Sequence, residues 1–123
     1  MKNKINILIA DDSEKIIYYV KKSLSESVNI QIIESADTLP TAQVIIRKEK
    51  TDVVVLDIQL PDGNGIDFLK WIKYSYPKIR VIMFTNNSDD VHRAIAKEYG
   101  ADYFFDKSFE FEQMIKTISE LHN

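Results

Sequence analysis

Five side chains suited to phosphate chemistry stand at the ends of hydrophobic runs in this sequence. Asp11 and Asp12 follow INILIA, Asp57 follows VVVL, Thr85 ends VIMFT, and Lys107 follows YFFD. A carboxylate can attack phosphorus, and a hydroxyl and an ammonium can hold the phosphoryl oxygens and offset their charge. Together these residue types predict a site for phosphoryl transfer.

The three acids need a partner if they lie close together. Unpaired carboxylates repel one another and raise one another's pKa, whereas a divalent cation removes that repulsion. A ligand set made only of oxygens suits Mg²⁺, with Mn²⁺ as an alternative, better than zinc or copper. Taken singly, each acid has a simpler explanation. Asp57 could cap the strand or the next helix, and Asp12 could be only the N-cap of a helix that opens at Ser13 and Glu14.

These side chains must be brought together by the elements that carry them. Hydrophobic runs predict strands over residues 5–10, 30–33, 53–56, 81–84 and 103–105. Between and after them, apolar residues recur at helical spacing in four sets: Ile16, Ile17, Val20 and Leu24; Phe68, Leu69, Ile72 and Tyr76; Val91, Ala94 and Ile95; Met114, Ile115, Ile118 and Leu121. Strict alternation predicts a parallel sheet with helices on both faces, whose strand ends meet at the edge where such sheets bind ligands.

Local signals set the ends of the remaining helices. A second helix has the weaker stripe Ala42, Ile45 and Ile46, with Pro40 in or just before its first turn. Ser88 is the expected start of the fourth helix. Gly100 is expected to stop that helix in a left-handed conformation.

Composition excludes several classes of protein. A chain of 123 residues fits one compact domain, expected over 1–123, and leaves no room for a second. The net charge of −3 gives no general field for binding nucleic acid or an anionic membrane. The chain has no cysteine, and its apolar run at the amino terminus is too short for a signal peptide or a membrane span. A cytoplasmic location is expected.

Taken in order, these motifs resemble the receiver domain of two-component response regulators, the CheY-like family. The resemblance covers essentially the whole chain, through Asp11-Asp12, DIQLPDGNG, Thr85, Gly100-Ala101-Asp102 and Lys107. It implies a flavodoxin-like (βα)5 fold, α/β and doubly wound, with a five-stranded parallel sheet of order 2-1-3-4-5.

The resemblance also implies roles for individual residues. Asp57 would be the phosphoacceptor, and Thr85 and Lys107 would hold the phosphoryl group. Asp11, Asp12, Asp57 and the main-chain oxygen of Gln59 would bind Mg²⁺. The donor would be a histidine of a sensor kinase or phosphotransfer protein. The domain would not be an enzyme beyond catalysing its own phosphorylation and dephosphorylation.

Readout and lifetime follow from the same resemblance. Thr85 and Phe104 would form a switch that alters the face made by the fourth helix, the fifth strand and the last helix, used for a downstream protein target or for self-association. That face would include His92, Arg93, Lys97 and Tyr103. Gln59 and Asn87 would flank the path of the water that hydrolyses the phosphoaspartate, and so tune its lifetime.

Three residues depart from the family pattern. Ser108 stands where proline is usual, Phe104 where tyrosine is frequent, and Asn86 where a small residue is common. The expected effects are a looser or less strained loop around Lys107, a switch ring that has no hydroxyl and moves by packing alone, and narrower access to the site.

Three other functions fit the pattern less well. A flavodoxin needs a phosphate loop after the first strand, where Asp11-Asp12 would repel a phosphate. A phosphatase of the haloacid dehalogenase type has a second acid two residues after its nucleophile, where this chain has Gln59. An unphosphorylated pseudo-receiver would not need the full set of five groups. The short ending after the last helix favours a receiver that stands alone.

Overall fold

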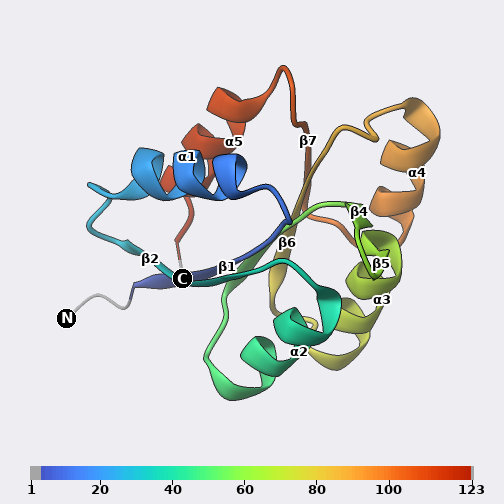
Figure 1. The fold of residues 1–123 in the computed structure, drawn as a ribbon, viewed down its shortest axis with the longest axis horizontal. Helices are drawn as coiled ribbons and strands as arrows, with labels where there is room; N and C mark the ends of the chain where they lie inside the picture. Colours follow the sequence, from blue (N-terminus) through green and yellow to red (C-terminus); the bar gives the residue numbers. More distant parts are fainter. Residues whose placement is uncertain (1–3, 123) are drawn as a thin grey trace.

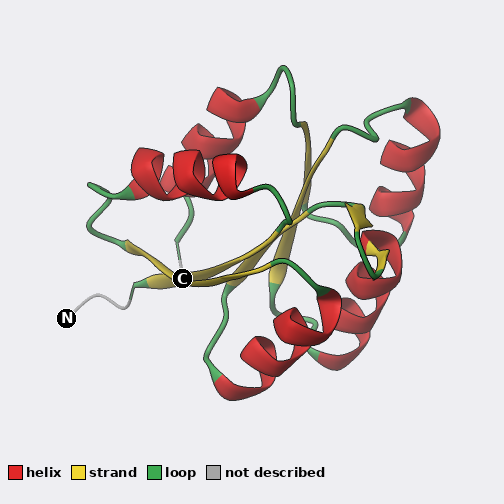
Figure 2. Cartoon of the chain, in the orientation of Figure 1, coloured by secondary structure: helices red, strands yellow, loops and turns green. Residues whose placement is uncertain are grey.

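The computed structural model describes residues 4–122 and shows a parallel sheet between two layers of helices (Figures 1 and 2). In chain order the main elements are β1 Ile5–Ala10, α1 Glu14–Leu24, β2 Ile30–Ala36, α2 Leu39–Lys48, β3 Val53–Leu56, α3 Gly65–Ser75, β6 Arg80–Thr85, α4 Asp90–Glu98, β7 Tyr103–Asp106 and α5 Phe111–Ser119. A short hairpin, β4 Gln59–Leu60 and β5 Gly63–Asn64, lies between β3 and α3. The sequence pattern predicted only a loop there.

The sheet has the order β2-β1-β3-β6-β7, which confirms the predicted 2-1-3-4-5 arrangement of the five main strands. All four pairings between these strands are parallel. The central strand β3 is buried along its whole length. Its side chains alternate between two core clusters: Val54 and Leu56 lie with residues of α2 and α3, and Val53 and Val55 lie with residues of α1 and α5.

The second helix forms as predicted. Ala42, Ile45 and Ile46 are its buried residues, and Pro40 lies in its first turn. At the other end of the domain, Gly100 has a φ of +95°, the left-handed conformation expected after α4.

The fourth helix differs from the prediction in its start and in its buried face. It begins at Asp90, because Asp89 caps it by accepting a hydrogen bond from the His92 N–H. Val91 is 66% exposed, whereas Ala96 is fully buried. Ala94 is also exposed, and Ile95 alone of the predicted stripe packs against the core. The helix has so few apolar residues that their spacing did not predict which of its faces is buried.

Candidate functional site

Asp11 and Asp57 lie side by side because their strands are neighbours in the sheet. The last residues of β1 and β3, Ala10 and Leu56, are paired in register. The next residue on each strand is the aspartate, and the Asp57 N–H donates to the Ala10 carbonyl at 3.1 Å. Both carboxylates are buried, with 2% and 7% of the residue exposed. The topology therefore brings two acids together at the centre of the sheet edge.

Lys107 lies between these two acids. Its Nζ is 2.7 Å from Asp11 Oδ2 and 2.8 Å from Asp57 Oδ2, and its side chain is only 9% exposed. Burial lowers the pKa of Lys107, but hydrogen bonds and charge attraction from the two acids outweigh it and raise that pKa. Burial raises the pKa of Asp11, against hydrogen bonds from Lys107 and the Ser13 N–H. The ammonium is thus held charged at this edge of the sheet.

Asp12 is the exposed member of the acidic group. The α1 helix is capped by Ser13, whose hydroxyl accepts a 3.3 Å hydrogen bond from the Ile16 N–H, so the alternative that Asp12 is only an N-cap is wrong. One ligand atom from each of Asp11, Asp12 and Asp57 lies within 4.8 Å of the others. Three carboxylate oxygens at this separation fit a hard divalent cation.

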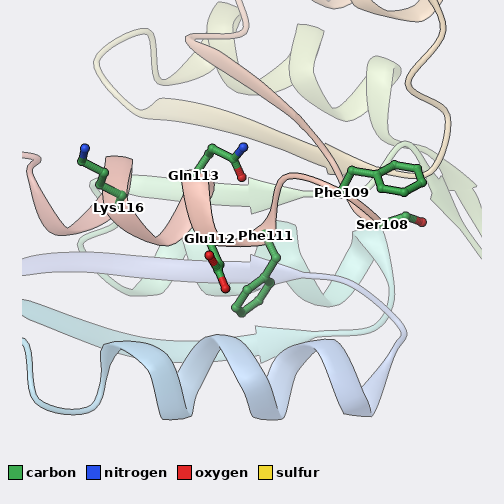
Figure 3. A pocket seen from close by; sticks show the side chains of 6 residues that line it. All are labelled: Ser108, Phe109, Phe111, Glu112, Gln113 and Lys116. Carbon is green, nitrogen blue, oxygen red and sulfur yellow. The ribbon is translucent and has the colours of Figure 1, made fainter.

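A hollow of about 470 Å³ opens over Asp57. It is lined by Asp12, Asp57, Gln59, Leu60, Pro61, Asn86, Asn87 and Lys107. Its wall is therefore mostly polar, and it holds carboxylates, amides and the ammonium at one place. A hollow of about 570 Å³ lies along the start of α5 (Figure 3), and Glu112 is the only acid among the described residues that line it.

Thr85 ends β6 and is fully buried. Its Oγ1 accepts a hydrogen bond of 3.2 Å from the Asn87 N–H, and its carbonyl accepts one of 3.0 Å from the Lys107 N–H. Asn86, which was expected to narrow access to the site, lines the hollow. Its side chain also accepts a hydrogen bond of 3.0 Å from the Ser108 hydroxyl. The loops after β6 and β7 are therefore joined beside the site.

The hairpin β4–β5 forms the wall next to Asp57. The Gln59 N–H donates to Asp57 Oδ1 at 3.2 Å, which orients the carboxylate. Gly65 lies so close to the end of β3 that an added Cβ would collide with the Asp57 carbonyl oxygen and lie 2.8 Å from Ile58 Cα. Glycine is required here because of this close approach of the backbone.

Phe104 lies apart from the hollow. It is partly buried against the core cluster of α2 and α3, and the Arg93 guanidinium lies 4.8 Å from the centre of its ring. A cation–π contact therefore covers the ring in addition to its packing against the core. Asp106, which the sequence pattern did not single out, is hydrogen-bonded to Ser88, which was expected only as the start of the fourth helix.

The surface expected to carry the readout is only partly available. Tyr103 is 37% exposed and stacks on Phe105, with ring centres 6.3 Å apart. Arg93 is engaged, since its guanidinium pairs with Glu110 at 2.9 Å. His92 is bonded to Asp89. Arg93, Lys97 and Tyr103 line a hollow of about 290 Å³.

Comparison with known proteins identifies this arrangement. The model of the response regulator receiver domain matches residues 7–119. The chain is 30% identical over 117 residues to the probable transcriptional regulatory protein SilR of Salmonella typhimurium, covering 95% of this chain and 50% of that protein. The BeF3-activated receiver domain of DrrB is 28% identical, with a TM-score of 0.77 and 94% of each chain covered. The non-phosphorylated receiver domain of RcsB from Escherichia coli is 20% identical, with a TM-score of 0.84, covering 94% of this chain and 93% of that one.

The fold and the acidic hollow define a CheY-like signalling domain of the doubly wound α/β class. The chain belongs to the response regulator receiver domain family, whose members act in phosphorylation-based two-component signalling and generally bind Mg²⁺. It spans about half the length of the curated relatives first matched. Across residues 4–122, every helix is too short or too polar to cross a membrane.

Proposed function

We propose that the chain accepts a phosphoryl group on Asp57 from a histidine kinase or phosphotransfer protein. The observation that carries this proposal is the position of Lys107, whose Nζ contacts both Asp11 and Asp57 beside the hollow that Asp12, Asp57 and Lys107 help to line. A carboxylate beside a fixed cation is suited to attack phosphorus, because the cation offsets the charge of the phosphoryl oxygens. A lone carboxylate at a strand end would have no cation to offset the charge of the phosphoryl oxygens.

In the proposed step, an oxygen of the Asp57 carboxylate forms a bond to phosphorus as the bond from phosphorus to the donor's histidine nitrogen breaks. The electron pair of the broken bond stays on that nitrogen, and Asp57 becomes an acyl phosphate. Before the transfer, the Gln59 N–H donates a hydrogen bond to Asp57 Oδ1 and so orients the attacking carboxylate. Lys107 then exchanges its contact with the carboxylate for one with the new phosphoryl oxygens.

Asp11, Asp12, Asp57 and the main-chain oxygen of Gln59 are the residues that would hold Mg²⁺, with Mn²⁺ as a substitute. The bound ion would supply charge neutralisation and orientation of the phosphoryl oxygens. The donor set supports this, since it consists of carboxylates gathered within 4.8 Å and contains no sulfur or imidazole.

Readout would begin at Thr85. The Thr85 hydroxyl, whose oxygen accepts the bond from the Asn87 N–H, can donate a charge-assisted hydrogen bond to a phosphoryl oxygen. Movement of Thr85 would free space for Phe104 and alter the face of α4, β7 and α5. That face would then bind a downstream protein or a second copy of the chain. The equilibrium between the two positions of the ring can shift only by the difference between the ring's contacts in them, and the contact with Arg93 is one of these.

We also infer that residues 1–123 form a single receiver domain in the cytoplasm. The family match over residues 7–119 supports this inference. The domain would catalyse only its own phosphorylation and dephosphorylation, and by itself would bind neither nucleic acid nor membrane, in keeping with a net charge of −3.

The test is labelling by acetyl phosphate with Mg²⁺, followed by the intact mass. The wild type should gain one phosphoryl group and Asp57→Asn none. Asp62→Asn is the matched control, because this exposed acid lies in the turn between β4 and β5, outside the lining of the hollow, and accepts a hydrogen bond from the Leu39 N–H at 3.3 Å. An unlabelled but folded wild type would identify a pseudo-receiver instead.

A further inference from the structure

Asp106, the last residue of β7, organises the turn that carries Lys107. Its Oδ1 accepts hydrogen bonds from the N–H groups of Ser108, at 2.8 Å, and Phe109, at 2.9 Å. Its Oδ2 accepts the hydroxyl of Ser88, which belongs to the loop after β6. The bond from Ser88, followed by those from Ser108 and Phe109, lowers the pKa of Asp106. Both oxygens are therefore occupied within the protein.

These bonds fasten the turn to the neighbouring loop. Ser88 joins it through Asp106, and Asn86 joins it through the Ser108 hydroxyl, at 3.0 Å. Figure 3 shows Ser108 and Phe109 together on this turn, before the start of α5. Serine at 108 supplies the backbone N–H that Asp106 binds, and a proline there would lack it. The turn around Lys107 is thus tied to its surroundings by side-chain hydrogen bonds.

Glu110 and Arg93 extend these bonds to the backbone of Asp106. Glu110 Oε1 accepts the Asp106 N–H at 2.8 Å and the Arg93 guanidinium at 2.9 Å. Arg93 Nε donates in turn to the Ser88 carbonyl at 2.8 Å. Asp106 therefore lies at the centre of a network that joins the start of α4 to the turn of Lys107.

We propose that Asp106 is a positioning residue for phosphoryl transfer, because its carboxylate fixes the turn from which Lys107 reaches Asp57. This inference rests on the proposed function. Asp106 is absent from the lining of the acidic hollow and its oxygens bind Ser88, Ser108 and Phe109, so it acts only through Lys107. Small misplacement of a catalytic group can cost up to about a hundredfold in rate.

The experiment compares Asp106→Ala with Asp106→Asn during labelling by acetyl phosphate at saturating Mg²⁺. The alanine variant should lower the maximal rate about tenfold, without a matching rise in the half-saturating donor concentration. Asparagine can accept the same two N–H groups and bond Ser88, so it should stay within about twofold of the wild type. In addition, the ¹⁵Nζ and ¹³Cε NMR signals of Lys107 should move in the alanine variant only.

Asp102→Ala is the matched control. Asp102 also accepts a backbone N–H, from Val81 at 2.8 Å, and pairs with Lys73, but it lies at the opposite end of β7. Its loss should lower the melting temperature and leave the rate unchanged. If Asp106→Ala does not fold, Ser88→Ala removes one of the three bonds and should slow labelling about threefold, a partial form of the same misplacement.

The outcomes are separable. A wild-type chain that takes up no phosphoryl group overturns the proposed function. Lys107 signals that stay in place in Asp106→Ala overturn the positioning role, whatever the labelling shows. An asparagine variant as slow as the alanine variant also overturns it, because charge and not the geometry of the turn would then set the rate.

Discussion

Replacing Lys107 with methionine tests the electrostatic design of the site. Methionine fills a similar volume but carries no charge, so Asp11 and Asp57 would be left as neighbouring buried acids without their cation. Both ion pairs have short contacts and side chains at most 9% exposed. The loss in free energy of unfolding should therefore be that of removing one partner from a buried ion pair, which is larger than that of breaking a surface salt bridge.

Removing one partner of a buried ion pair costs about 3 to 5 kcal/mol. We take about 3 kcal/mol, because Asp11, whose pKa burial already raises, can escape part of the repulsion by taking up a proton. For a domain of this size, about 1 kcal/mol corresponds to a shift of roughly 4 °C in melting temperature. Lys107→Met should therefore melt about 12 °C lower than the wild type in buffer without divalent ions.

The assay is thermal unfolding followed by circular dichroism, with urea titration to obtain the free energy of unfolding. Lys70→Met is the control, because Lys70 pairs with Asp67 at 4.0 Å through side chains 44% and 78% exposed. Its replacement should cost less than about 1 kcal/mol. A loss in Lys107→Met no larger than in Lys70→Met would refute the view that Lys107 compensates buried carboxylate charge.

Three further predictions concern the metal, the lifetime and the readout. Millimolar Mg²⁺ should raise the melting temperature of the wild type by relieving carboxylate repulsion, and Asp12→Ala should remove most of that rise. Replacing Gln59 and Asn87 together with alanine should change the rate of phosphoryl loss at least severalfold, with little effect on stability, since both amides line the hollow. Thr85→Ala should still accept phosphoryl, more slowly, but should not transmit the change to α4 and β7.

Each of these predictions has a clear contrary result. A wild-type melting temperature unmoved by Mg²⁺ would count against a metal site at the acidic group. Unchanged phosphoryl decay in the double alanine variant would remove Gln59 and Asn87 from control of hydrolysis. For the readout, amide NMR with beryllofluoride should show shifts spreading to α4 and β7 in the wild type only. Equal spread in Thr85→Ala would rule out the proposed switch.

The arrangement of the acids was predictable because it follows from strand order. Val53–Leu56 is an unbroken apolar run that ends at Asp57, and a buried parallel strand must deliver its next residue to the sheet edge. Asp11 and Lys107 follow other strands in the same way. The family resemblance implied the order of these strands, and with that order the meeting of the side chains follows without knowledge of local contacts.

The network around Asp106 could not be predicted in the same way. Serine is a residue type that often begins a helix, so Ser88 was a reasonable start for α4. Only the tertiary structure shows that Asp89 is the N-cap and that the Ser88 hydroxyl donates a hydrogen bond to Asp106. The buried face of α4 was missed for a related reason. Besides Ile95, the residue of this helix in contact with the core is Ala96, a small residue that spacing does not distinguish from the exposed Ala94.

The most direct test of the central claim is to locate the acyl phosphate. The chain is labelled with acetyl phosphate and Mg²⁺ and reduced with borohydride, which converts an aspartyl phosphate to homoserine. Its peptides are then sequenced by mass spectrometry. We predict homoserine at position 57 alone, with Asp11 and Asp12 unchanged. Homoserine at either of those two residues, or a folded chain that yields none at Asp57, would contradict the assignment of Asp57 as the acceptor.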